Sequence, residues 1–160
     1  MTMTHPVLVL GIGNILLTDE GVGVHVVKAL QAEAARPGGE QLPEGVEIVD
    51  GGTFGADLID LVAHRPRVIV IDAVQATGTP GTILKFGSED MATKTSVSMS
   101  LHEVGLLETL LMAKHLGCPP GEVVVFGIIP GSLEPGLDLT PPVAAAVPKV
   151  IAMIREELGR

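Results

Sequence analysis

Short apolar runs alternate with longer amphipathic segments along the chain. Most of the runs are continuous stretches of Val, Ile and Leu, which is typical of strands buried in a parallel sheet. They predict strands at residues 7–10, 46–49, 67–72, 82–86 and 123–129. The intervening segments predict helices at 20–36, 56–64 and 103–115, and a last helix from about residue 140. This alternation predicts an α/β protein with a mostly parallel sheet and helices on both faces.

Turn and cap signals add detail to this outline. The segment 74–81 is rich in turn residues, so the strand at 82–86 is predicted to fold back as an antiparallel hairpin on the strand before it. Residues 87–100 are polar and predict an irregular segment. Thr140 is a favourable N-cap for the last helix, with a proline next to it in the first turn, where proline is tolerated. Without a repeat or linker, residues 1–160 are predicted to form one domain.

Composition narrows the classes of partner. Apolar residues make up 46% of the chain, but three Phe and no Trp or Tyr provide no aromatic platform for single-stranded nucleic acid. A formal net charge of −9 disfavours both phosphate backbones and anionic membrane surfaces. The single cysteine, Cys118, excludes an intrachain disulfide and a cysteine zinc cage. No signal peptide or membrane span is recognisable, so we expect a soluble, cytoplasmic monomer without nucleic-acid or membrane partners.

Two adjacent carboxylates follow the first predicted strand. In sheets of this kind, ligands bind beyond the carboxyl ends of the strands. The loop after residues 7–10 ends in Asp19 and Glu20, where the first helix is predicted to begin. Helix capping would explain this position, because carboxylates are favoured at helix N-termini. Capping accounts for one acid better than for both, so Asp19 as the cap leaves Glu20 available for a ligand.

Asp72 and His102 are predicted at the same edge of the sheet. Asp72 ends the clearest central strand, where a carboxylate is costly unless it is paired, bound to a cation or hydrogen-bonded to loop amides. His102 opens a helix, whose positive end favours the neutral imidazole that binds metals, although a single histidine there is more often structural. With Glu20 they offer two carboxylates and one imidazole, a set that suits a divalent metal with open coordination positions.

Other catalytic motifs are incomplete or missing. Gly11 and Gly13 begin a dinucleotide-binding pattern, but Leu16 stands where the third glycine should be. The ribose-binding acid should follow about 20 residues on, and the nearest acid at a strand end, Asp50, is too far away. The chain contains no GxxxxGK[ST] phosphate loop, no HExxH zinc motif and no GxSxG nucleophile elbow. Cys118 stands between a helix end and two prolines, where packing in a turn is its expected role.

Several longer stretches resemble the maturation proteases of nickel–iron (NiFe) hydrogenases. They are VLVLGIGNILLTDEGVGVHVV, VEIVDGGTFGADLIDL, RVIVIDAV, SLHEVGLLETL and VFGIIPGSLEPGLDLTPPV, and they span roughly residues 7–143 in the order found in the family. The resemblance implies a three-layer α/β/α sandwich around a twisted, five-stranded sheet. It also implies metal-binding roles for Glu20, Asp72 and His102, although some members have Asp where Glu20 stands. Residues 87–100 match less well, so substrate contacts are not carried over to them.

Such enzymes remove a short C-terminal peptide from the precursor of the hydrogenase large subunit after nickel has been inserted. The resemblance therefore implies an endopeptidase whose partner is that precursor. Its nickel is expected to arrive with the precursor rather than to be held tightly by the resting enzyme. Our hypothesis is that Glu20, Asp72 and His102 complete the coordination of this nickel. A polarised carbonyl, or a water activated by Glu20 or Asp72 as the catalytic base, would then allow hydrolysis.

Three questions stay open at this point. The sequence does not decide whether nickel takes part in catalysis or only in recognition. A peptidyl-tRNA hydrolase also has a glycine-asparagine turn after its first strand, but it would need a basic face for tRNA, which the net charge of −9 disfavours. A non-catalytic nickel chaperone using the same three residues is the other alternative.

Overall fold

The protein has five strands and five α-helices within the residues that the structure, a computed structural model, describes. These are residues 5–53, 57–93 and 101–160, of which 57, 91–93 and 101–104 are described by their backbone alone. The strands are β1 (Val7–Ile12), β2 (Val46–Gly52), β3 (Arg67–Ala73), β4 (Ile83–Gly87) and β5 (Glu122–Ile128). The helices are the 3-10 turn η1 (Thr18–Gly21), α1 (Val22–Ala35), α2 (Asp57–Val62), α3 (Ser88–Thr93), α4 (Leu101–His115) and α5 (Pro141–Leu158).

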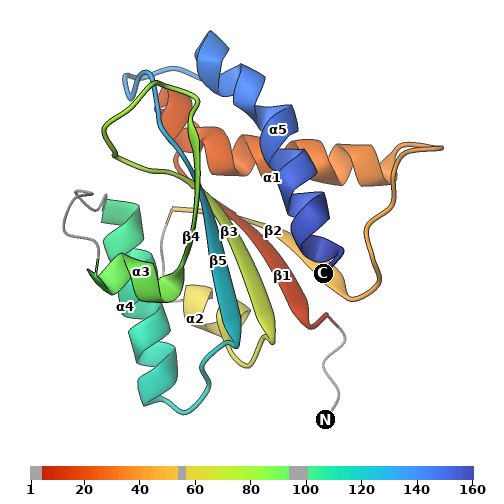
Figure 1. The fold of residues 1–160 in the computed structure, drawn as a ribbon, viewed down its shortest axis with the longest axis vertical. Coiled ribbons are helices and arrows are strands. Elements are labelled where there is room, and N and C mark those ends of the chain that lie inside the picture. The colour runs from red at the N-terminus through yellow and green to blue at the C-terminus, as the bar shows by residue number, and fades with distance from the viewer. Residues whose placement is uncertain (1–4, 54–56, 94–100) are drawn as a thin grey trace.

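The strands form one twisted sheet in the order β2-β1-β3-β5-β4 (Figure 1). Neighbours pair in parallel, except that β4 is antiparallel to β5. Helices α1 and α5 cover one face, and α2, α3 and α4 lie on the other (Figure 1). The predicted α/β sandwich, with a mostly parallel five-stranded sheet between helices, is confirmed.

The alternation of side chains along the central strands explains the three layers. In β3, Ile69 and Ile71 pack in the core beneath α1 and α5, whereas Val68 and Val70 pack beneath α2 and α4. All four are at most 1% exposed. Because both faces of β3 are covered, its sequence is a continuous apolar run rather than an alternating one. Burying each such side chain contributes about 1.5–3 kcal/mol.

The predicted hairpin is half right. The strand after the turn is antiparallel, but β4 pairs with β5 and not with β3. Both sides of β3 are occupied by strands that are parallel to it, β1 and β5. The nearly continuous apolar β5 suits that central place, whereas β4 carries Lys85 and is only partly buried, which suits an edge.

Two helix predictions also need correction. The predicted first helix, 20–36, is divided into η1 and α1, because Gly21 is the N-cap of α1 and the preceding turn is a 3-10 helix. The segment 87–100, predicted to be irregular, contains α3, and residues 94–100 lie outside the described part of the chain. Thr140 is at the predicted N-cap position, since α5 begins at Pro141, but its side chain makes no cap hydrogen bond and its hydroxyl donates to Asp19 instead.

Candidate active site

The candidate site lies where the carboxyl ends of β1 and β3 meet. These strands are adjacent in the centre of the sheet, and the chain leaves them in opposite directions. From β1 it continues through α1 on one face to β2, and from β3 it continues to β4, α4 and β5 on the other side. A crevice beyond the carboxyl ends at such a switch point is where open α/β sheets bind ligands.

Two glycines hold Glu20 close to this junction. Gly13 has a φ of +148°, and a Cβ added there would lie 2.0 Å from the carbonyl oxygen of Glu20. A Cβ on Gly23 would lie 2.2 Å from the carbonyl oxygen of Ile71 and 2.5 Å from that of Ile12. Only glycine permits these approaches, so the backbone around Glu20 packs directly against the ends of β1 and β3. Glu20 itself is half-buried.

Asp72 supplies a carboxylate at the end of the central strand. Its side chain is 3% exposed, and Oδ1 accepts a hydrogen bond from the amide of Ala73 at 2.8 Å. This bond agrees with a hydrogen-bonded carboxylate at the strand end, although its donor is the last residue of β3 and not a loop amide. The strand alternation that turns Ile71 toward α1 turns Asp72 toward the face covered by α2 and α4. The two acids therefore approach the same edge from different elements.

His102 lies in the first turn of α4, on the face toward which Asp72 points. The C-terminal end of α4 is fixed at the opposite edge of the sheet, because the carbonyl of Cys118 accepts a hydrogen bond from His64 at 3.1 Å, just before β3. Fifteen helical residues rise about 22 Å, about the length of a seven-residue strand. The first turn of α4 therefore returns to the carboxyl edge (Figure 1). The side chain of His102 lies outside what the structure describes.

Asp19, which the sequence suggested as a helix cap, binds the loop before α5 instead. It is fully buried and makes no cap bond to its own helix. One oxygen accepts hydrogen bonds from the amides of Gly131 (2.7 Å) and Ser132 (3.0 Å) and from the Thr140 hydroxyl (2.6 Å); the other accepts from the Thr140 amide (2.8 Å). Burial would raise the pKa of this carboxyl, but the hydrogen bonds, led by that of the Thr140 hydroxyl, outweigh burial and lower it below 3.8.

The buried Asp19 therefore joins η1 to the loop before α5 and to the N-cap of that helix. No local signal predicts this contact, because the partners are more than 100 residues apart. It leaves Glu20 as the acid of the pair at the junction of β1 and β3. The predicted capping role of Asp19 is therefore wrong, because its carboxylate binds the loop before α5 instead of its own helix, and the ligand role of Glu20 stays a prediction.

Within the described side chains, no group of three or more His, Cys, Asp or Glu residues is placed to hold a metal ion. The side chain of His102 does not belong to that set, so the predicted trio stays a prediction. In the part of the chain with described coordinates, no helix is long and apolar enough to cross a membrane.

Comparison with known proteins adds the decisive observation. A family model described as hydrogenase maturation protease matches residues 24–157. The chain belongs to this family. The hydrogenase 2 maturation protease of Escherichia coli is 40% identical over 155 residues, covering 94% of this chain and 91% of the relative. The hydrogenase expression/formation protein HupD of Rhodobacter capsulatus is 37% identical, over 95% of this chain and 70% of the relative.

The fold of the family is also the fold of this chain. The solved structure of the hydrogenase maturating endopeptidase HybD from Escherichia coli superposes with a TM-score of 0.84 at 37% identity, covering 95% of this chain and 91% of HybD. Membership in the hydrogenase maturation protease family makes the protein an endopeptidase. It therefore favours the protease over the peptidyl-tRNA hydrolase and the chaperone that the sequence left as alternatives.

Proposed function

We propose that this protease removes the C-terminal extension of a NiFe hydrogenase large-subunit precursor that already carries nickel. The observation that carries the proposal is Asp72, a carboxylate that is 3% exposed at the end of a central strand. Its position at the switch point is the one at which such folds bind ligands, and a carboxylate there is a suitable donor for a divalent metal. Glu20 approaches the same junction from η1.

In this proposal, Glu20, Asp72 and His102 bind the nickel that the precursor brings with it. Two carboxylates and one imidazole are suitable donors for a divalent ion that keeps some ligands of its own. Bound there, nickel would supply Lewis-acid polarisation of the scissile carbonyl. Glu20 and Asp72 are the residues of this chain that can accept a proton from an attacking water. Only a nickel-loaded precursor gains the binding energy, so the arrangement acts as a checkpoint.

The test is intact mass spectrometry of the cognate precursor, with and without inserted nickel, after incubation with the protease. We expect loss of a C-terminal peptide from the nickel-loaded form alone. Asp72→Asn and His102→Ala are expected to abolish the loss, while far-UV circular dichroism shows an unchanged fold. Glu156→Gln, at an exposed acid of α5 outside the trio, is the control for removal of a carboxylate.

Three outcomes would contradict parts of the proposal. Processing at the native rate by both trio variants would refute the assigned residues. Equal processing of nickel-free and nickel-loaded precursor would refute the checkpoint. An unchanged mass of the cognate precursor in both forms would refute the substrate.

A further inference from the structure

Four exposed aliphatic side chains lie on two loops that meet next to η1. They belong to Ile15, Leu16, Leu133 and Leu137, and we refer to these four residues as the apolar ledge. Leu16 is 60% exposed and Leu137 is 64% exposed. Single exposed leucines are common, but exposed apolar side chains gathered on one surface indicate an interaction site.

The apolar ledge is held in place by main-chain hydrogen bonds between the two loops. The amide of Gly136 donates to the carbonyl of Leu16 at 2.9 Å, and the amide of Thr18 donates to the carbonyl of Gly136 at 2.9 Å. The Asp19 amide donates to Ser132 at 3.1 Å, and its buried carboxylate adds the bonds described above. In Figure 1 the blue loop before α5 accordingly runs beside the orange-red start of α1. A preformed surface of this kind loses little conformational entropy on binding.

A hollow of about 160 Å³ opens at the apolar ledge. Ile15 and Leu137 form one side of it, and Val24, His25 and Lys28 of α1 form the other. A volume of about 150 Å³ accommodates an apolar group of the size of benzene. The hollow is therefore large enough for one aliphatic or aromatic side chain of a partner.

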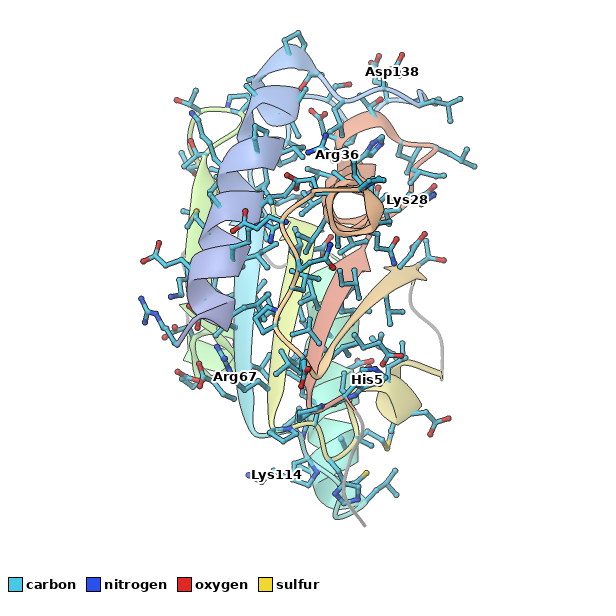
Figure 2. The ribbon with its side chains drawn as sticks, turned by 90° about the vertical axis from the view of Figure 1, so that its right-hand side faces the viewer. His5, Lys28, Arg36, Arg67, Lys114 and Asp138 are labelled. Carbon is cyan, nitrogen blue, oxygen red and sulfur yellow. The ribbon has the colours of Figure 1, made fainter. Side chains whose placement is uncertain are left out.

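The charge around the apolar ledge selects the chemistry of that partner. Two of its leucines are each followed by an exposed acid, Glu134 and Asp138. Residues 11–24 and 129–141, which contain both loops, have no Lys or Arg. Lys28 lies at the same end of the molecule as Asp138 (Figure 2), but its ammonium is 3.9 Å from the carboxylate of Asp50. An apolar surface with this acidic border is complementary to an apolar segment that carries Lys or Arg.

We propose that the apolar ledge is the docking surface for the large-subunit precursor, which inserts an apolar side chain next to a Lys or Arg. This inference rests on the proposed function. The ledge continues directly into the candidate site, because the Glu20 amide donates to the carbonyl of Leu17 at 3.1 Å. Leu16 and Glu20 are four residues apart, so their Cα atoms are at most about 14 Å apart, a distance that about four extended residues of a substrate span. The docking residue would therefore lie at most about four positions from a scissile bond placed at Glu20.

The experiment compares three double variants with the native protease. Leu16→Ser/Leu137→Ser removes the apolar contact, and Glu134→Lys/Asp138→Lys reverses the acidic border. Leu111→Ser/Leu116→Ser is the matched control, because these leucines of α4 and the turn after it are 56% and 65% exposed but belong to neither ledge loop. The probe is the nickel-loaded cognate precursor. Its binding is measured by biolayer interferometry and its cleavage by steady-state kinetics.

We expect both ledge variants to bind the precursor about tenfold more weakly, which corresponds to about 1.4 kcal/mol. KM should rise by a similar factor with kcat unchanged, because the lost contact is present in the ground state as well as in the transition state. The control variant should match the native protease. Circular dichroism should be unchanged in all of them, since every substituted side chain is exposed.

Unchanged binding and KM in both ledge variants would overturn the docking proposal. So would a native protease that is a dimer in sedimentation and becomes a monomer only in the ledge variants, with KM unaltered, because a second copy would then occupy the ledge. A precursor that binds in a ledge-dependent way but is not cleaved would instead refute the proposed function and leave the docking surface supported.

Discussion

The buried carboxylate of Asp19 offers the sharpest test of how the site is held together. We consider Asp19→Asn, which keeps the shape of the side chain but replaces one oxygen by an amide nitrogen. In the protein, one carboxylate oxygen accepts three hydrogen bonds and the other accepts one from the Thr140 amide. The least damaging orientation of the asparagine keeps its oxygen toward the three donors. The side-chain nitrogen of the asparagine then faces the backbone N–H of Thr140. Both groups are donors, so the Thr140 amide loses its acceptor.

The magnitude follows from these contacts. A buried amide left without an acceptor costs about 1–3 kcal/mol. The three remaining bonds lose the assistance of the negative charge, and charge-assisted hydrogen bonds are roughly twice as strong as neutral ones. We therefore expect Asp19→Asn to lower the free energy of unfolding by about 2–4 kcal/mol. This is a large part of the ~5–15 kcal/mol that stabilises a typical domain.

Urea denaturation followed by circular dichroism is the suitable assay, because the chain has no Trp or Tyr whose fluorescence could report unfolding. The control is Asp138→Asn, at an exposed acid on the loop before α5, which also carries the partners of Asp19. Its free energy of unfolding is expected to change by no more than about 0.5 kcal/mol. An Asp19→Asn variant that is also within 0.5 kcal/mol of the native protein at pH 7 would refute the reasoning.

The pH dependence gives an independent check on the same carboxylate. The pKa of Asp19 is lowered in the folded protein, so the unfolded chain binds its proton at higher pH than the folded chain does. The stabilisation is therefore fully present above the ordinary pKa of 3.8 and is lost as pH falls from there through the folded pKa. The stability difference between the native protein and Asp19→Asn should be constant from about pH 5 to 8 and should shrink below about pH 4. A stability difference that grows as the pH falls would contradict the lowered pKa of Asp19.

Two further substitutions test the packing. Gly23→Ala should lower the free energy of unfolding by about 3 kcal/mol or more, or prevent folding, because the added Cβ would overlap two strand carbonyls. Gly159→Ala, whose Cβ would have no contact under 3.5 Å, is the control and should leave the thermal unfolding nearly unchanged. Glu157→Gln should lower the free energy of unfolding measured in urea by about 1–3 kcal/mol, because this carboxylate is 4% exposed and accepts a 2.8 Å hydrogen bond from Lys85. Glu156→Gln, at an exposed position, is the control, and equal effects of the two substitutions would show that the Glu157–Lys85 pair contributes nothing.

The central strands could be predicted from the sequence because burial on both faces leaves a signal in each residue. The run RVIVID has no alternation to obscure it, and the strand was predicted to within one residue of β3. Asp72 stands out against the same background, since a lone acid at the end of an apolar run needs an explanation. The position of Asp19 and Glu20 at the carboxyl edge could be predicted in a similar way, because they follow the glycine-rich turn after the apolar run of β1.

The contacts that could not be predicted join parts of the chain that are distant in sequence. The partner of β4 depends on which strand occupies the other side of β3, and nothing in residues 83–87 specifies that. The contact of Asp19 with Thr140 spans 121 residues, and each partner has a satisfactory local explanation as a helix cap. The apolar ledge is another such case, because Ile15 and Leu137 come to line one hollow only after their loops have joined.

One contact network therefore supports both the candidate site and the apolar ledge. Thr18 has a φ of +53°, which is unfavourable for a β-branched residue, and the backbone keeps this conformation because both loops are joined around it. The next residue, Asp19, fixes the loop before α5, and the one after it is Glu20. The residue that holds the loop at 131–140 is thus joined to Glu20 by a single peptide bond. The loops that carry the apolar ledge and the backbone that carries Glu20 are therefore fixed by the same hydrogen bonds, so loss of these bonds in Asp19→Asn should disturb both.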